Sequence, residues 1–299
     1  MPDDELAAVQ SRCEAGPVTA RRNDAGLIYL DVTAPAAAAR LYLQGAHVTH
    51  YQPRGGAPAL FTSAVSHYAP GKPIRGGVPI VFPWFGPHPA DASLPAHGWA
   101  RTSLWQLQQA HRDDGGDVTI VLTLGVGELS LKPVDGWALI YTVRVGRALS
   151  MELDVQNMGK TPQAFEAALH TYLSVTDVRQ VRVEGLDGRD YLDKVDAQTR
   201  KAQSGPIQIT GETDRVYLDT PDAVTVHDPA AGRRLVIEKT GSATTVVWNP
   251  WVNKAKAMPD FGDDEWPKML CVETANAAEN AVTVGPQNSH SMRATVRVE

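Results

Sequence analysis

A histidine stands in a mostly apolar segment of this 299-residue chain, where it could act as an acid or a base. The segment FEAALHTYLSV covers residues 165–175. As an extended strand, it would put His170 on one face together with Tyr172 and Ser174. Because the groups that face an imidazole set its pKa, such a histidine can be tuned for proton transfer. A histidine that is satisfied by its neighbours in the core is the more frequent case, and this segment alone favours it.

A glutamate occupies a comparable position further along the chain. Glu273 is the only acid in the strand-like run KMLCVETA, residues 268–275, and alternation places it on the same face as Met269 and Cys271. Glutamates are almost never fully buried without a partner, because an isolated buried carboxylate is costly. Glu273 therefore either makes a structural ion pair at the wet end of a strand or lines a cavity. In a cavity, partial burial would raise its pKa from about 4.3 toward neutrality, where a general base is effective.

Two arginines bracket a long segment rich in proline, glycine and tryptophan. Arg75 precedes Gly76 and Gly77, where the backbone can approach a ligand closely, and Arg101 ends the run HGWAR, which begins at His97. Two guanidinium groups in one pocket would suit a phosphate group, whose oxygens accept hydrogen bonds from their fixed donor forks. Two unrelated surface arginines are the alternative, and the residues alone favour that alternative.

Acidic residues in two further runs have competing interpretations. Asp214, in ETDRVYLD, stands just before an expected strand, where it could accept hydrogen bonds from sugar hydroxyls or simply belong to a turn. Asp260, Asp263 and Asp264, in MPDFGDDEW, do not have the EF-hand spacing and no histidine joins them. We interpret these three as loop acids and expect no metal site.

The scaffold that positions these residues is predicted to be built from strands. Short runs that alternate apolar and polar residues recur along the chain, separated by Gly, Asn, Asp or Pro, and only residues 4–14 have a helical pattern. Such strands at short spacing are typical of an antiparallel sandwich or barrel. The long segments 70–101 and 248–268 are too rich in Pro, Gly and Trp for regular structure, so we expect functional loops there. The expected strands include residues 26–33, 39–43, 117–124, 137–145, 150–156, 180–183, 215–218, 223–227, 234–239, 244–248 and 294–298.

Composition bounds the class of protein and of partner. Hydrophobic residues make up 43% of the chain and charged residues 21%, with a formal charge of -6, as expected for an ordinary globular protein. The acidic balance argues against nucleic acid as a partner. The run MPDDELAAVQ does not resemble a signal peptide, and no apolar run approaches the ~18 residues that span a bilayer. With only two cysteines, Cys13 and Cys271, we expect a reducing, cytoplasmic location and no association with membranes.

Taken in order, seven runs closely resemble the aldose 1-epimerase superfamily, and within it the glucose-6-phosphate 1-epimerase (hexose-6-phosphate mutarotase) branch. The runs are RGGVPIVFPWFG, LPAHGWAR, HTYLSV, ETDRVYLD, VVWNPW, DFGDDEW and MLCVETAN. The resemblance implies an all-β fold, a large twisted antiparallel β-sandwich of the galactose mutarotase-like type. We expect one such domain over residues 26–299, preceded by an extension of unknown role over residues 1–25.

The resemblance also implies roles for the residues singled out above. Glu273 matches the general base that takes a proton from the anomeric hydroxyl, and His170 matches the general acid that protonates the ring oxygen. His97 would bind the sugar near its ring oxygen and Asp214 its ring hydroxyls, while Arg75 and Arg101 match the phosphate-binding arginines of the branch. No cofactor and no metal are expected. The partner would be a phosphorylated sugar, and a monomer is compatible with the sequence.

Other functions remain open at the level of sequence. One is a sugar-binding β-sandwich without catalysis, and another is a mutarotase of a different phosphorylated or free aldose. A glycoside hydrolase that uses Glu273 and Asp214 as its two carboxyl groups is a further possibility.

Overall fold

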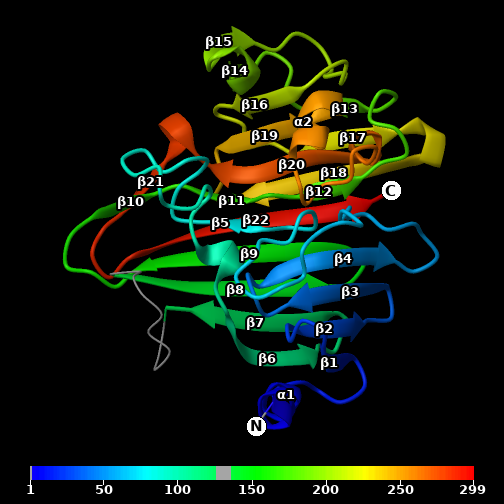
Figure 1. The fold of residues 1–299 in the computed structure, drawn as a ribbon, viewed down its shortest axis with the longest axis vertical. Helices are drawn as coiled ribbons and strands as arrows, with labels where there is room; N and C mark the ends of the chain where they lie inside the picture. Colours follow the sequence, from blue (N-terminus) through cyan, green and yellow to red (C-terminus); the bar gives the residue numbers. More distant parts are fainter. Residues whose placement is uncertain (1, 126–135) are drawn as a thin grey trace.

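The computed structural model describes residues 2–125 and 136–299, and antiparallel β-sheets dominate it (Figure 1). All pairings between its named strands are antiparallel, and the strands form two eight-stranded sheets, a four-stranded sheet and a two-stranded sheet. The prediction of an all-β antiparallel sandwich is therefore confirmed. Among the described residues, no helix is long and apolar enough to cross a bilayer.

One eight-stranded sheet forms the long back layer of the molecule. Strand β9 (Ala148–Asn157) shows why it forms: every second residue is buried, so one face of the strand packs on the core. Its order is β13-β17-β18-β22-β9-β8-β7-β6. The other members are β13 (Arg182–Glu184), β17 (Val224–Asp228), β18 (Arg233–Thr240), β22 (Ser289–Val298), β8 (Trp137–Val145), β7 (Val118–Leu124) and β6 (Gln106–Arg112).

The second eight-stranded sheet carries the residues of chemical interest. Its order is β15-β14-β16-β19-β20-β11-β5, with β12 also paired to β20. Both β19 and β20 are buried along their whole length, as expected for central strands covered on both faces. The members are β15 (Thr199–Ala202), β14 (Asp190–Asp193), β16 (Thr213–Tyr217), β19 (Thr244–Asn249), β20 (Met269–Asn276), β11 (Ala167–Leu169), β5 (Ile80–Val81) and β12 (Tyr172–Ser174).

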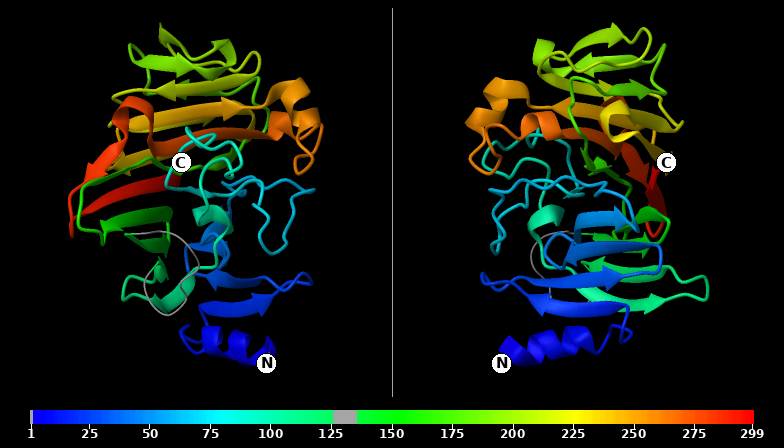
Figure 2. Two further views of the ribbon diagram at one scale, coloured as in Figure 1. Left: turned by 60° about the vertical axis from the view of Figure 1, so that its left-hand side comes forward. Right: turned by 90° about the vertical axis from the view of Figure 1, so that its right-hand side faces the viewer.

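The four-stranded sheet packs against the first eight-stranded sheet. It contains β1 (Val18–Arg22), β2 (Ile28–Thr33), β3 (Ala37–Tyr42) and β4 (His47–Pro53) in sequence order. In both views of Figure 2 its blue strands lie beside the green strands β6–β9. One hydrophobic cluster joins these layers, since it contains Leu30 and Leu41 of the small sheet together with Leu122 and Tyr141 of the large one.

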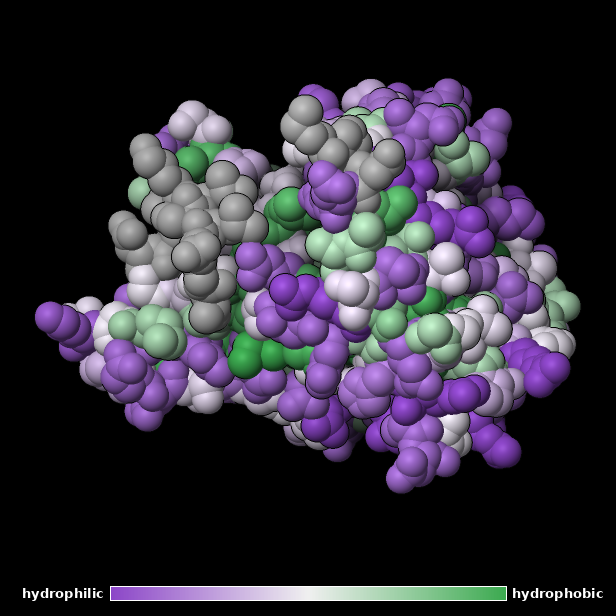
Figure 3. Space-filling model, turned by 90° about the horizontal axis from the view of Figure 1, so that it is seen from below, coloured by the Kyte–Doolittle hydropathy of each residue, from purple (hydrophilic) through white to green (hydrophobic). Residues whose placement is uncertain are grey.

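The segment before residue 26 takes part in this sheet. Strand β1 pairs with β2, and helix α1 (Pro2–Gln10) packs Leu6 and Val9 against the main core. Figure 3 shows the end of the molecule where α1 lies, and hydrophilic side chains cover most of that face, with small apolar areas between them. The separation of residues 1–25 from a domain that starts at residue 26 stays a prediction.

Two local expectations are wrong. The segment 165–175 is not one strand, because it is divided into β10 (Gln163–Phe165, paired with β21, Val282–Val284), β11 and β12, and His170 lies in the gap between the last two. The segment 248–268 is not wholly irregular, because it contains helix α2 (Trp251–Ala257) and the 3-10 turn η4 (Trp266–Lys268). By contrast, the segment 70–101 contains only the two-residue strand β5 and the start of the 3-10 turn η1 (Ala100–Thr102).

Candidate active site

His170 is held at the break between β11 and β12. Its backbone N–H donates to the Pro79 carbonyl, outside the regular ladder of the sheet. Its ring is stacked on that of Tyr172, with centroids 4.8 Å apart and planes 11° apart, and it meets the edge of Trp248 at 6.2 Å. His170 is only 8% exposed, so these rings determine the orientation of the imidazole.

The register of the sheet brings Glu273 to His170. Strand β12 pairs Tyr172 with Cys271, and β11 pairs Leu169 with Thr274, so the same register runs through the break and sets His170 opposite Glu273. Glu273 is 1% exposed, and its Oε1 lies 3.4 Å from His170 Nε2. Within residues 2–125 and 136–299, neither Glu273 Oε2 nor His170 Nδ1 has a hydrogen-bond partner. Buried polar atoms are almost always satisfied, so this pair has the unmet hydrogen-bonding capacity expected of a ligand site.

Burial shifts both members of this pair toward their uncharged forms. It raises the pKa of the Glu273 carboxyl well above its ordinary value, the negative charge of Asp214 raises it further, and Lys194 opposes the shift. Burial also lowers the pKa of the His170 imidazole well below its ordinary value, assisted by His97 and by the charges of Arg101 and Arg75. The proton that the two residues can exchange is therefore held mainly by the carboxyl.

His97 stands beside His170 on the loop that precedes η1. The ring centroids of the two histidines are 5.8 Å apart, and His97 Nδ1 accepts a hydrogen bond from the Gly86 N–H at 3.2 Å. Burial, with the charges of Arg101, Lys194 and Arg75, lowers the pKa of His97 to about 3. A neutral imidazole that accepts at Nδ1 carries its proton on Nε2, so His97 presents a hydrogen-bond donor.

Glycine is required next to His97 by close packing of the backbone. Gly98 has a φ of 70°, and a Cβ there would collide with the Phe82 carbonyl. Gly76 and Gly77, which follow Arg75, also have positive φ values, and a Cβ on either would collide with neighbouring backbone atoms. The tight turns that carry His97 and Arg75 therefore depend on these glycines.

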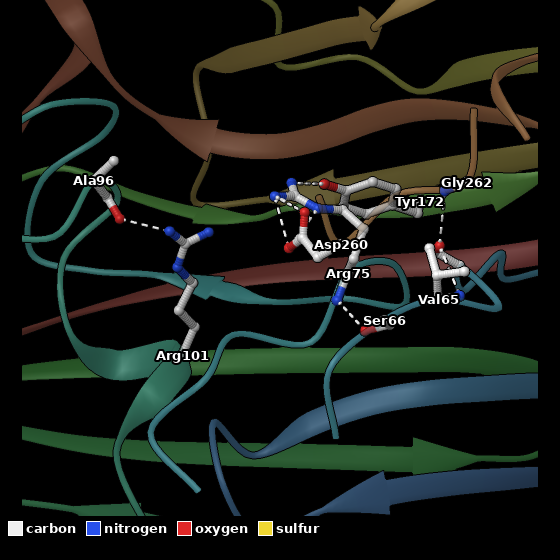
Figure 4. Close-up of polar contacts among 9 residues, drawn as sticks. Val65, Ser66, Arg75, Ala96, Arg101, Tyr172, Asp260 and Gly262 are labelled. Carbon is white, nitrogen blue, oxygen red and sulfur yellow. Dashed lines mark hydrogen bonds and ion pairs between the residues drawn. The ribbon is translucent and has the colours of Figure 1, made fainter. Parts of the chain in front are cut away.

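Arg75 is already engaged by an acid within the protein (Figure 4). Its Nε and Nη2 donate to the Asp260 carboxylate at 3.1–3.2 Å, and its Nη1 donates to the Tyr172 hydroxyl at 3.1 Å. Burial alone would lower the pKa of the guanidinium, but Tyr172 and Asp260 hold it above its ordinary value. Asp260 lies in the loop between α2 and η4, as expected, and it is in addition a buried partner of Arg75.

Arg101 extends from η1 toward the same region and has less engagement. Its Nη2 donates to the Ala96 carbonyl at 2.7 Å (Figure 4). In the part of the chain that the structure describes, no carboxylate lies within ion-pair distance of Arg101. Burial lowers its pKa, and the charge of Arg75 lowers it further, which shows that the two guanidinium groups lie within electrostatic range. Arg101 thus brings positive charge that no carboxylate among the described residues pairs.

Asp214 and Lys194 lie on the other side of Glu273. Asp214 belongs to β16, where it is paired with Trp248 of β19, and Lys194 Nζ lies 3.8 Å from its carboxylate. Burial raises the pKa of Asp214, and the charge of Lys194 lowers it in part. Lys194 also stands over the Phe85 ring at 5.1 Å from the centroid. The sequence reasoning missed Lys194, because the run YLDKVD has no recognisable motif and only the turn after β14 brings it here.

The structure therefore brings the six predicted residues into one cluster. Ring contacts link His97, His170 and Tyr172, and Tyr172 in turn binds Arg75. Glu273 lies 3.4 Å from His170. Asp214 is linked to His97 through Lys194 and the Phe85 ring, and Arg101 binds the carbonyl of Ala96, the residue before His97. Across the described ranges, no group of three or more His, Cys, Asp or Glu residues could hold a metal ion.

Comparison with known proteins decides the family. The sequence model of the family described as Aldose 1-epimerase matches residues 30–297. The chain belongs to the aldose 1-epimerase family. Like that family, it is an isomerase of the epimerase or mutarotase type, which disfavours a sugar-binding module without catalysis.

Three relatives of this aldose 1-epimerase family member are informative. A protein of Escherichia coli (strain K12), which bears the provisional name glucose-6-phosphate 1-epimerase, is 36% identical over 93% of this chain and 92% of its own. A protein of Cenchrus ciliaris with the same provisional name is also 36% identical, over 83% of this chain and 77% of its own. The crystal structure of a protein from Salmonella typhimurium, provisionally named a mutarotase, superimposes with a TM-score of 0.87 at 30% identity, over 98% of this chain and 99% of its own.

Proposed function

We propose that this aldose 1-epimerase family member interconverts the α and β anomers of a hexose 6-phosphate, with glucose 6-phosphate as the main substrate. The observation that carries the proposal is the buried His170–Glu273 pair, 3.4 Å apart, beside an arginine that no carboxylate in the described residues pairs. The names of the E. coli and Cenchrus ciliaris relatives support glucose 6-phosphate as the sugar.

In the proposed reaction, Glu273 and His170 move protons at the anomeric centre. The Glu273 carboxylate takes the proton of the C1 hydroxyl, the C1–O5 bond breaks, and the protonated His170 imidazole donates its proton to O5. The product is the open-chain aldehyde. Rotation about C1–C2 presents the other carbonyl face, and the two residues then exchange roles as O5 attacks C1 and the ring closes. Each such proton transfer contributes about 10²–10⁴-fold to the rate.

The proposed substrate would itself help to prepare this pair. The reaction requires an ionised Glu273 beside a protonated His170, whereas burial favours the opposite distribution of the proton. Arg75 and Arg101 are among the charges that lower the pKa of His170, and they are not among those that shift Glu273. A phosphate carrying about -1.5 to -2 charges would offset the arginines, raise the pKa of His170 and move the proton toward the imidazole.

The phosphate and the sugar ring would be held by separate groups. Since Asp260 already balances Arg75, Arg101 supplies the unbalanced charge for the phosphate, and Arg75 adds donors to it. These two arginines would therefore bring about one unbalanced positive charge to the phosphate. His97 would donate from Nε2 to a ring oxygen, and Asp214 would accept from ring hydroxyls.

The two cysteines are unpaired, which supports the proposed cytoplasmic location.

The proposal is tested by exchange NMR on the anomers of glucose 6-phosphate. The purified protein should raise the α/β exchange rate in proportion to its concentration, in the presence of a chelator and without any nucleotide. Free glucose should be a poorer substrate, which tests the phosphate preference. Methyl glucoside 6-phosphate, whose anomeric centre is blocked, should not react, whereas a hydrolase would release methanol from it. An exchange rate equal to that without protein would overturn the proposal.

A further inference from the structure

Lys194 reaches into the candidate site from an element that none of the sequence motifs covers. It is the first residue of the 3-10 turn η2 (Lys194–Asp196), which connects β14 to β15. The turn is fixed locally, because the Asp193 carboxylate accepts a hydrogen bond from the Val195 N–H and an ion pair from Lys201 at 2.8 Å. The position of Lys194 is therefore set by a tightly tied hairpin next to β16.

The ammonium group of Lys194 lies between Asp214 and the ring of Phe85. On one side it is 3.8 Å from the Asp214 carboxylate, and on the other it stands over the Phe85 ring, 5.1 Å from the centroid. A Cβ built on Gly86 would lie 4.0 Å from the same nitrogen. Because Gly86 is hydrogen-bonded to His97, this places Lys194 close to the loop that carries the histidine.

None of the described residues accepts a hydrogen bond from this ammonium group. The distance of 3.8 Å to Asp214 exceeds a hydrogen bond, and no hydrogen bond from Lys194 Nζ to any other described residue is formed. The side chain is 29% exposed, so solvent reaches part of it. An ammonium group offers three N–H donors. A sugar hydroxyl placed beside Asp214 would meet both an acceptor and an unused donor.

We propose that Lys194 is a substrate-binding residue, whose ammonium group donates hydrogen bonds to hydroxyl oxygens of the sugar ring while Asp214 accepts from them. This inference rests on the proposed function, since it takes a phosphorylated hexose as the ligand. It separates the site into a phosphate end, at Arg75 and Arg101, and a hydroxyl end, at Asp214 and Lys194. The charge of Lys194 also opposes that of Asp214 next to Glu273, so its loss leaves Glu273 protonated to a higher pH.

The test compares Lys194→Met with Lys194→Arg and with Lys256→Met, which removes a lysine from an exposed position on α2. Loss of a hydrogen bond from a charged donor should lower kcat/KM on glucose 6-phosphate by about 10- to 100-fold in Lys194→Met. The acid limb of its pH profile should move to higher pH. Lys194→Arg should recover part of the activity, and Lys256→Met should behave as the wild type. Unchanged kcat/KM and an unchanged acid limb in Lys194→Met would overturn the inference.

Calorimetric binding separates this inference from the proposed function. Lys194→Met should bind glucose 6-phosphate more weakly than the wild type, while its affinity for inorganic phosphate stays the same. Equal losses for both ligands would overturn the assignment of Lys194 to the ring hydroxyls. If the wild type binds glucose 6-phosphate but does not speed its anomer exchange, the proposed function fails, and the binding result still decides the role of Lys194.

Discussion

Replacement of Arg101 by methionine should remove the preference for a phosphorylated sugar. The charge of Arg75 is paired with that of Asp260, whereas Arg101 is bonded among the described residues only to the Ala96 carbonyl, so Arg101 carries most of the unbalanced charge. Hydrogen bonds to charged groups contribute about 1.5–3 kcal/mol each. At about 1.4 kcal/mol for each factor of ten, Arg101→Met should lower kcat/KM on glucose 6-phosphate by roughly 10- to 100-fold.

Free glucose provides the internal comparison for this variant. Free glucose has no phosphate for Arg101 to bind. The charge of Arg101 lowers the pKa of His170, so its removal should not reduce the turnover of free glucose. The assay is anomer exchange by NMR on both sugars, with Arg147→Met as the control, because Arg147 is exposed on the turn between β8 and β9. Equal losses on glucose and on glucose 6-phosphate would refute the assignment of Arg101 to the phosphate.

Three further outcomes follow from the charges around the pair. Inorganic phosphate added to the wild type should accelerate the exchange of free glucose, because it offsets the arginines that lower the pKa of His170; inhibition or no effect would contradict this. Burial and, next in size, the charge of Asp214 raise the pKa of Glu273. Asp214→Asn should therefore move the acid limb of the kcat/KM profile to lower pH, and a shift to higher pH would contradict this expectation. Arg75→Met leaves the Asp260 carboxylate buried and unpaired, and should lower the free energy of unfolding in urea by ~2–4 kcal/mol, somewhat less than for a fully buried pair. The double variant with Asp260→Asn should recover most of that loss.

Most strands of the fold were predictable because apolar and polar residues alternate locally along the sequence. The run Trp137–Val145 is a strand from end to end, as its period of two indicates. The interruption at His170 was not predictable, since Thr171 and Tyr172, which follow it, are residue types that favour strands. It arises from a long-range contact, the hydrogen bond from the His170 N–H to the Pro79 carbonyl. Helix α2 was not predicted, because Pro250 and the neighbouring Trp248 and Trp251 are not typical of a helix. It packs on η4 through the contact of Trp251 with Trp266.

In the candidate site, too, local features were predictable from the sequence, whereas contacts between distant residues were not. His170 and Glu273 could be singled out as polar residues in apolar surroundings, but their opposition depends on the register between β12 and β20. The sequence did not reveal the partner of Asp260, because Arg75 is 185 residues away in the chain. Lys194 has no local signal at all, since a lysine after a strand is usually a solvated turn residue.

The exchange rate of glucose 6-phosphate anomers in Glu273→Gln and His170→Ala tests the central claim most directly. Glutamine keeps the shape of Glu273 but cannot take a proton, and alanine removes the imidazole while the phosphate contacts stay intact. Each variant should bind glucose 6-phosphate with nearly the wild-type affinity and lose about 10²–10⁴-fold in kcat. Wild-type kcat in either folded variant would contradict proton transfer by this pair.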